Sequence, residues 1–283
     1  MSYADILFKE SCVDILTNGT DTQDQVVRPH WPDGEPAYTI KKFGLIHEYD
    51  LRKEFPALTI RPVPLKLCMD EILWIYQKKS NNIKDLKPHI WDEWADENGS
   101  IGTVYGYSVG TKTNVNGIMM DQMDRVLYLL KNSPYSRRIM IDLYQFKDLE
   151  TGHLDPCCFN FIFNVTKESN PENKLVLNGI LNQRSQDMLA ANGWNVCQYA
   201  IFLMMVAQVC DMIPGKLIHV IADAHIYDRH ELIVRKLLSR EEFPAPKVSL
   251  NKDVKDFYQF TTDDLIIENY QHGEQIKNIP IAI

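Results

Sequence analysis

One segment in the second half of the chain is apolar on almost every side. Residues 194–212 read WNVCQYAIFLMMVAQVCDM, and at helical spacing they leave no polar face for solvent. Such a helix has to be enclosed by other elements, so the chain must fold into layers around it. Pro214 and Gly215 follow it and are predicted to end it. We therefore expect one large domain, residues 1–283, with a substantial core.

The rest of the chain mixes helical and strand periodicity. Helices are predicted over residues 64–80, 121–134 and 228–240. Strands are predicted over residues 137–144, 156–165, 174–185 and 216–227, and another follows the turn-rich loop at 30–40. Because strands and helices do not alternate strictly, the pattern favours a layered α+β domain of the broad α/β class over a doubly wound sheet.

Charge and composition limit the kinds of partner. The net charge is −8, which argues against nucleic acid or an anionic membrane as the main ligand. An anionic small molecule stays compatible if arginines gather in one pocket. The first residues lack a basic start followed by an apolar block, and no stretch reaches the roughly 18 apolar residues of a membrane span. We expect a cytoplasmic protein.

Two of the six cysteines are adjacent, Cys157 and Cys158, directly after Pro156. Strand alternation would place Cys158 with Asn160 on the more polar face, so it does not favour Cys157 as a reactive thiol. The spacing lacks the second ligand of a zinc deaminase and the C-x-x-C of a redox pair. A structural thiol and a nucleophile both remain open on the residues alone. All six cysteines are expected to be reduced, and the other four are expected to be small buried hydrophobes: Cys12, Cys68, Cys197 and Cys210.

Several motifs occur together in a fixed order. They are PYSRRI (134–139), LDPCC (154–158), LNQRSQDMLAANGWNVCQYA (181–200), ADAHIYDRHEL (222–232) and IPIAI (279–283), with DEILW and IWDEWADENG upstream. Each motif is weak alone, but the set in this order and spacing is specific. In this combination the chain resembles the thymidylate synthase family from about residue 25 to its last residue.

The resemblance implies a fold and a reaction. The fold would be a large mixed, mostly antiparallel sheet flanked by helices. The reaction would be the reductive methylation of dUMP to dTMP, in which 5,10-methylenetetrahydrofolate supplies the one-carbon unit and the hydride and leaves as dihydrofolate. The resemblance implies neither a metal nor a flavin. It also implies an obligate homodimer with paired active sites.

The resemblance assigns the nucleophile to Cys157, whose thiolate would add to carbon 6 of uracil and activate carbon 5. Cys158 stands where the family commonly has histidine and would be a structural neighbour. Asn195 would read the uracil 4-oxo group and ring N–H and stabilise the enolate, and a helix N-cap role is compatible with it. The other implied catalytic residues are Glu71 and Tyr105, which move protons through water, and Asp187, which frames both ligands.

The resemblance also implies two sets of binding residues. Those for dUMP are Arg28, Arg137, Arg138, Arg184, Ser185, Asn195, His225 and Tyr227, with Arg137 and Arg138 contributed by the other subunit. Four guanidiniums around one phosphate would lower the pKa of the thiol. The folate residues are Ile90, Trp91, Trp94, Asp187, Ala191, Trp194, Ala282 and Ile283, of which the last two belong to a tail that closes over the ligands.

This sequence departs from the family pattern at several positions, which we interpret as features of a branch. Besides Cys158, Ile162 replaces a common glutamine, Gln198 replaces a serine, and Ala191 begins a changed segment before Asn195. Two other functions remain open. A hydroxymethylase of the same fold would act on dUMP or dCMP, although those acting on dCMP carry aspartate at the position of Asn195. A catalytically inactive nucleotide-binding protein is the other, and the intact set of motif residues argues against it.

Overall fold

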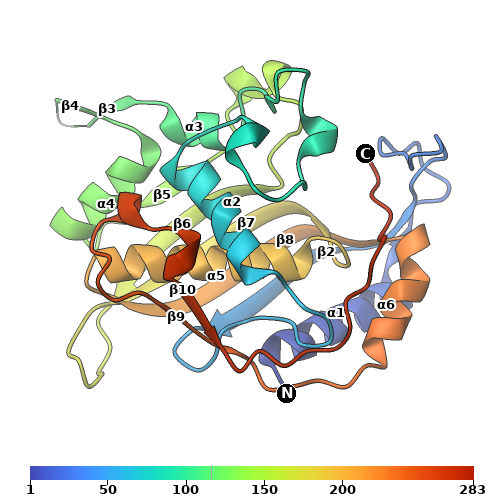
Figure 1. Ribbon diagram of the computed structural model, residues 1–283. Helices are drawn as coiled ribbons and strands as arrows, with labels where there is room; N and C mark the ends of the chain where they lie inside the picture. The colour runs from blue at the N-terminus through green and yellow to red at the C-terminus, as the bar shows by residue number, and fades with distance from the viewer. Residues whose placement is uncertain (116) are drawn as a thin grey trace.

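The computed structural model describes residues 1–115 and 117–283. Its main sheet has six strands in the order β1-β2-β8-β7-β6-β5 (Figure 1). Their bounds are Thr20–Asp21 for β1, Thr39–Asp50 for β2, Met140–Asp142 for β5, Cys158–Thr166 for β6, Val176–Asp187 for β7 and Ile213–Tyr227 for β8. Strands β7 and β8 run parallel, and the other neighbouring pairs are antiparallel. The expected mixed, mostly antiparallel sheet is confirmed.

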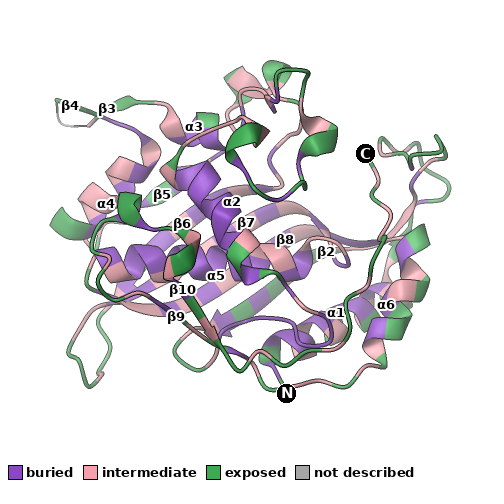
Figure 2. Ribbon diagram, in the orientation of Figure 1, coloured by how far each residue is buried: buried purple, intermediate pink, exposed green. Residues whose placement is uncertain are grey.

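Helices cover one face of this sheet. Figure 1 shows α5 lying along the sheet, with α2 on its outer side and α1 and α6 toward the β2 edge. The helices are α1 (Tyr3–Asn18), α2 (Leu65–Ile72), α3 (Gly106–Gly110), α4 (Gln122–Asn132), α5 (Asn192–Val209) and α6 (Glu231–Leu238). A single π turn, Leu73–Gln77, extends α2. Figure 2 shows α5 buried along most of its length, as its all-round apolar sequence predicts.

The end of α5 differs from the prediction. The helix stops at Val209, and Asp211 adopts a positive φ of 54°, which reverses the chain direction. Pro214 and Gly215 therefore lie inside β8 and do not end the helix. The other strand pairs are small: β3 (Thr113–Val115) with β4 (Ile118–Met120), and β9 (Lys247–Leu250) with β10 (Leu265–Glu268).

A bulge at the start of β6 overturns the expected placement of the two cysteines. Cys158 pairs with Gln183 and Asn160 with Asn182, so one extra residue interrupts the alternation. Cys158 is consequently buried on the α5 side, where Phe161 also stacks on Tyr199. The prediction that Cys158 shares the more polar face was wrong, because simple alternation ignores this extra residue.

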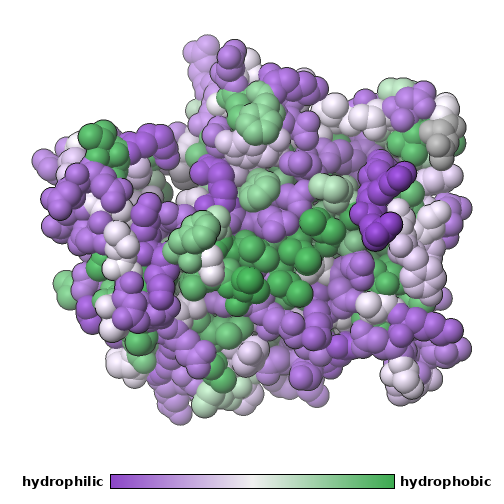
Figure 3. Space-filling model, turned by 180° about the vertical axis from the view of Figure 1, so that it is seen from behind, coloured by the Kyte–Doolittle hydropathy of each residue, from purple (hydrophilic) through white to green (hydrophobic). Residues whose placement is uncertain are grey.

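The opposite face of the sheet carries apolar side chains that no helix of the described chain covers. Strand register places Ile162 opposite Ile180, Ile180 opposite Ile218, and Ile46 opposite Val220. Ile46 is 67% exposed, and the other members of this surface are half-buried. Figure 3 shows apolar side chains gathered in the middle of the molecule seen from behind. We call Ile46, Ile162, Ile180, Ile218 and Val220 the open sheet face.

Candidate active site

Cys157 lies just before β6, next to a guanidinium from the neighbouring strand. Arg184 Nη2 is 3.8 Å from Cys157 Sγ, and the Arg184 side chain donates to the carbonyls of Asp155 at 2.6 Å and Pro156 at 3.0 Å. These two carbonyls fix the guanidinium in place. Cys157 is half-buried, whereas Cys158 is buried among Tyr199 and other core side chains.

Two opposing effects act on the Cys157 thiol. Burial raises its pKa, and the positive charges of Arg184 and Arg28 lower it, while Asp155 raises it further. Burial is the larger effect, so the pKa lies above its ordinary value. The expectation that arginines lower this pKa describes only one of the two effects. The positive charges of these two arginines would stabilise the negative charge of a Cys157 thiolate.

Tyr105 approaches the nucleophile from the other side. Its hydroxyl accepts a hydrogen bond from the Cys157 backbone N–H at 3.1 Å, and its ring packs edge-on against Trp91 with centroids 4.7 Å apart. The Tyr105 backbone has a φ of 52°, a strained conformation for an aromatic residue. Such strain is typical of functional sites, because packing must hold the side chain in place.

Glu71 is a buried carboxylate held by two indole groups. Trp91 Nε1 donates to one carboxylate oxygen at 2.8 Å, and Trp194 Nε1 donates to the other at 2.6 Å. Burial raises the pKa of Glu71 to about 7, although these donors and Gln198 partly oppose that shift. A carboxyl group that titrates near neutrality can both accept and release a proton.

Asn195 connects to this carboxylate through Gln198. Asn195 Nδ2 donates to Gln198 Oε1 at 3.2 Å, and Gln198 in turn hydrogen-bonds Glu71. Asn195 is the fourth residue of α5, and Ala191 occupies the N-cap. The suggestion that Asn195 caps the helix was wrong, because the helix begins three residues earlier. Asn195 is half-buried, and its amide atoms hydrogen-bond Gln183 and Gln198.

Asp187 lies beside the C-terminal tail. One carboxylate oxygen accepts from the backbone N–H groups of Leu189 and Ala190, and the other is 3.5 Å from His230 Nδ1. His230 Nε2 lies 2.7 Å from the carbonyl of Pro280. The final residue, Ile283, exchanges two backbone hydrogen bonds with His30. The tail is thus tied to the segment that carries Arg28 and to Asp187.

The remaining nucleotide-binding candidates divide into two groups. His225 Nδ1 lies 2.8 Å from Asp223 Oδ1, and its ring packs on Tyr227. Burial raises the pKa of Tyr227, Asp187 raises it further, and Arg28 lowers it. Strand register pairs Ser185 with Asp223 and Asp187 with His225, so Ser185, His225 and Tyr227 share one face at this end of the sheet. Arg137 and Arg138 do not join them. They are exposed and precede Ile139, which bonds Phe163 near the far end of β6, about 20 Å from Cys157 at strand spacing.

The folate candidates lie at different depths. Trp91 is buried and Trp94 is half-buried, with ring centroids 6.0 Å apart, and Ile90 is exposed. Ala282 is half-buried in the tail beside the exposed Ile283. Trp91 and Trp194 both use their indole N–H groups on Glu71, so these N–H groups are not available to a ligand.

Three polar residues near this site were not predicted from sequence. Gln183 and Gln198 hydrogen-bond Asn195, and His230 links Asp187 to the tail. Gln183 lies within the motif at 181–200 and His230 within the motif at 222–232, but the sequence indicated no role for either residue. Their position inside these motifs was the sequence feature that could have indicated a role for Gln183 and His230. Burial of a polar side chain, which sequence does not report, is what identifies them.

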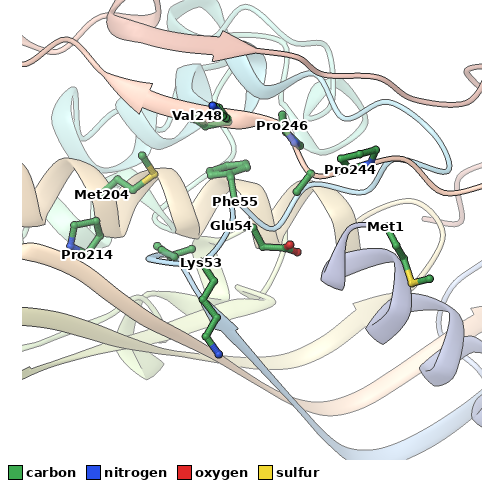
Figure 4. A pocket seen from close by; sticks show the side chains of 12 residues that line it. Met1, Lys53, Glu54, Phe55, Met204, Pro214, Pro244, Pro246 and Val248 are labelled. Atoms are coloured by element: carbon green, nitrogen blue, oxygen red, sulfur yellow. The ribbon is translucent and has the colours of Figure 1, made fainter.

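Other features of the described chain lie elsewhere or are absent. A cavity of about 440 Å³ is lined by Phe55, Met204, Pro244 and their neighbours, and it contains none of the candidate residues (Figure 4). Within residues 1–115 and 117–283, no group of His, Cys, Asp and Glu side chains could hold a metal ion. No helix in this part of the chain is long and apolar enough to cross a membrane.

Comparison with known proteins gives a consistent result. The family model described as thymidylate synthase matches residues 7–282. Thymidylate synthases of Bacillus subtilis subsp. natto and Bacillus phage phi3T are each 38% identical over 281 residues, which cover 98% of this chain and 98% of each relative. That of Clostridium beijerinckii is 39% identical over 246 residues, covering 84% of this chain and 88% of the relative.

The fold agrees as well. The solved structure of thermostable thymidylate synthase A from Bacillus subtilis superposes with a TM-score of 0.91 at 36% identity, covering all of both chains. Sequence identity above 30% over nearly the full length and a shared fold lead to one assignment. The chain belongs to the thymidylate synthase family.

Proposed function

We propose that this protein is a methyltransferase that converts dUMP to dTMP with 5,10-methylenetetrahydrofolate as the donor of both methylene and hydride. The observation that carries the proposal is the placement of Cys157. Its sulfur lies 3.8 Å from a fixed guanidinium, beside Tyr105. The buried Glu71 hydrogen-bonds Gln198, which also binds Asn195. This is the set that thiolate addition to a pyrimidine requires.

The chain's own residues divide the reaction between them. The Cys157 thiolate adds to carbon 6 of uracil, and the negative charge moves to the 4-oxo group, where an Asn195 N–H can stabilise it. Carbon 5 then attacks the methylene carbon of the folate. Glu71 and Tyr105 handle the proton that leaves carbon 5 as the bond between the methylene carbon and the folate nitrogen breaks, which releases tetrahydrofolate and leaves an exocyclic methylene on the ring. Hydride transfer from the folate to the exocyclic methylene and expulsion of the thiolate complete dTMP.

The arginines that we propose for the dUMP phosphate also favour the thiolate form of Cys157. Arg184 and Arg28 already lower the pKa of Cys157 in this structure. We infer that Ser185, His225 and Tyr227 complete the nucleotide site, the last two at the ribose. For the folate we propose the tryptophan faces, with Asp187, Ile90, Ala191 and the tail residues Ala282 and Ile283 closing the site.

The open sheet face supports a homodimer. Ile46, Ile162, Ile180, Ile218 and Val220 form an apolar surface that pairing with a second copy would bury. Arg137 and Arg138 lie too far from their own Cys157 to reach its phosphate site, so their use requires a partner. We propose that they act across the interface. We also propose that residues 1–283 form one catalytic domain and that the protein acts in the cytoplasm.

The product of the folate distinguishes this function from its nearest alternative. Purified protein supplied with dUMP and 5,10-methylenetetrahydrofolate should produce dihydrofolate and dTMP in equal amounts. The rise in absorbance that dihydrofolate causes measures the reaction. A hydroxymethylase of the same fold would instead release tetrahydrofolate and 5-hydroxymethyl-dUMP. If the protein binds the nucleotide but forms neither dTMP nor 5-hydroxymethyl-dUMP, it is a catalytically inactive member of the family.

A further inference from the structure

A buried histidine lies behind the pyrimidine-reading amide, on the far side of a glutamine. His219 is fully buried in β8, and its Nε2 atom is 2.7 Å from Gln183 Oε1 on β7. Gln183 is also buried, and its Nε2 atom donates to Asn195 Oδ1 at 3.2 Å. The three side chains therefore form a hydrogen-bonded series that ends at the base-reading amide. None of the reaction steps above uses His219.

The direction of each hydrogen bond in this series is determined by a backbone carbonyl. Gln183 Nε2 lies 2.9 Å from the carbonyl of Ser185, which can only accept. The amide nitrogen of Gln183 therefore points toward Ser185 and Asn195, and its oxygen points toward His219. Because that oxygen is an acceptor, His219 Nε2 must carry the hydrogen.

The other ring nitrogen of His219 agrees with this assignment. His219 Nδ1 is buried and has no hydrogen-bond partner among the described residues. A buried N–H without an acceptor has lost its hydrogen bond to water, so Nδ1 is more stable as a bare lone pair. Burial also lowers the pKa of His219 to about 3, which keeps the ring neutral. His219 is thus a neutral Nε2–H donor.

We propose that His219 is a positioning residue for pyrimidine selection, because its Nε2–H fixes the Gln183 amide, which in turn fixes the Asn195 amide for uracil. This inference rests on the proposed role of Asn195 as the reader of the base. In the fixed orientation, Asn195 Oδ1 receives the N–H of Gln183 and can accept the ring N–H of uracil, and Nδ2 can donate to the 4-oxo group. The reversed amide would match cytosine, which offers an amino group and a bare ring nitrogen.

A second support limits the size of the effect. Gln186 Nε2 donates to the carbonyl of Asp187 at 3.1 Å and lies 3.4 Å from Asn195 Oδ1, so it favours the same orientation more weakly. Loss of the His219 donor therefore removes one of two supports. We expect discrimination between dUMP and dCMP to decrease by about tenfold, the size of one hydrogen bond of about 1.4 kcal/mol.

The strand pairing offers a matched control. His47 on β2 lies directly opposite His219 in the register, is also buried, and has a pKa that burial lowers to about 4. Its ring nitrogens lie 2.7 Å from Ser11 Oγ and 3.3 Å from the Tyr49 hydroxyl, and neither of these residues belongs to the series. The His47 ring packs edge-on against that of His219 with centroids 6.4 Å apart, so His47→Leu changes the packing beside His219 but removes no hydrogen bond of the series that ends at Asn195.

The test compares three variants by kcat/KM for dUMP and by the inhibition constant of dCMP. The compared quantity is the kcat/KM for dUMP multiplied by the inhibition constant of dCMP, a ratio of dUMP use to dCMP affinity. His219→Leu should lower this ratio by about tenfold. His219→Gln, whose amide nitrogen can occupy the position of Nε2, should keep the ratio within about threefold of the wild type. His47→Leu should lose stability but keep the ratio. A folded His219→Leu protein with an unchanged ratio, or a Gln variant as impaired as the Leu variant, would overturn the proposal.

A measurement on the unaltered protein is independent of whether the Leu variant folds. Long-range 1H–15N spectra of 15N-histidine-labelled protein, with the His219 signal assigned by its loss in His219→Gln, should show Nε2 protonated and Nδ1 bare down to about pH 5. An Nδ1–H tautomer would contradict the proposal. If the wild-type protein does not turn over dUMP at all, the proposed function fails instead, and the tautomer result still stands.

Discussion

At the scale of single residues, the site combines buried acids and thiols with the donors that stabilise their charged forms. The Cys157 thiol and the Glu71 carboxyl are both held above their ordinary pKa by burial, and each has fixed N–H donors that oppose the shift. Such groups change protonation state easily when a charged ligand enters. We therefore assign the chemistry to Cys157 and Glu71. Cys158 faces Tyr199 in the core and has a packing role.

The indole donors to Glu71 give a prediction for the pH profile. Trp91→Phe removes one N–H donor that favours the ionised carboxylate, so the pKa of Glu71 should rise above about 7 by roughly one unit. The matching pKa in the profile of kcat/KM for dUMP should move upward. Trp94→Phe is the control, because its ring packs on Trp91 and donates no hydrogen bond to Glu71 in the described structure. An unchanged or lowered pKa in the Trp91 variant would argue against this role.

At the scale of elements, the sequence predicted most of the main helices and strands but not α1, and it also failed where connections between elements decide the outcome. The all-round apolar α5 and the alternating β7 and β8 were recognised from periodicity alone. The bulge that moves Cys158 to the core face and the turn at Asp211 were not, because each depends on one residue with no strong sequence signal. The surroundings of Glu71 were hidden for another reason: its partners Trp91 and Trp194 are distant along the chain.

The C-terminal tail gives a prediction of its own. His230 donates to the Pro280 carbonyl through Nε2 and faces Asp187 through Nδ1, with Asp228 nearby, and Asp187 raises the pKa of His230. Because the pKa of His230 is raised, the stabilisation from the interaction of charged His230 with Asp187 is complete below pH 6.5. This stabilisation is lost as pH rises through the higher pKa of the folded state. Removal of Ile283 by carboxypeptidase should therefore become several-fold faster at pH 8.5 than at pH 6.

A variant controls for the pH dependence of the protease. His230→Gln retains one donor for Pro280 but cannot titrate, so its trimming rate provides the reference at each pH. The ratio of the wild-type rate to the Gln rate should increase with pH. A ratio that stays constant, or one that falls, would show that His230 does not hold the tail through its charge.

At the scale of the whole molecule, the described chain has an uncovered apolar sheet face and two arginines far from their own site. Both features have the same explanation if two copies pair through the open sheet face. Arg137 and Arg138 would then serve the partner's phosphate site, and neither copy would be complete alone. The sequence could suggest this arrangement only through the family resemblance, since periodicity does not reveal what covers a sheet.

Mixed dimers test this arrangement. Cys157→Ser and the double variant Arg137→Ala with Arg138→Ala should each be nearly inactive at low dUMP. When the two are co-expressed, half of the dimers should be mixed, and each of these should contain one complete site, which restores about a quarter of the wild-type activity. Recovery of activity supports donation across the interface. Its absence, with mixed dimers confirmed by mass, would place the arginines in their own subunit's site or outside any site.

The central claim is that one particular sulfur bonds to the pyrimidine, and it can be tested directly. The protein is incubated with 5-fluoro-dUMP and 5,10-methylenetetrahydrofolate, digested, and the adduct is mapped by tandem mass spectrometry, with Cys158→Ser as the matched control. We predict one adduct per site on Cys157, retained in the Cys158 variant and absent in Cys157→Ser. An adduct on Cys158, or none on either sulfur in protein that binds both ligands, would contradict this account.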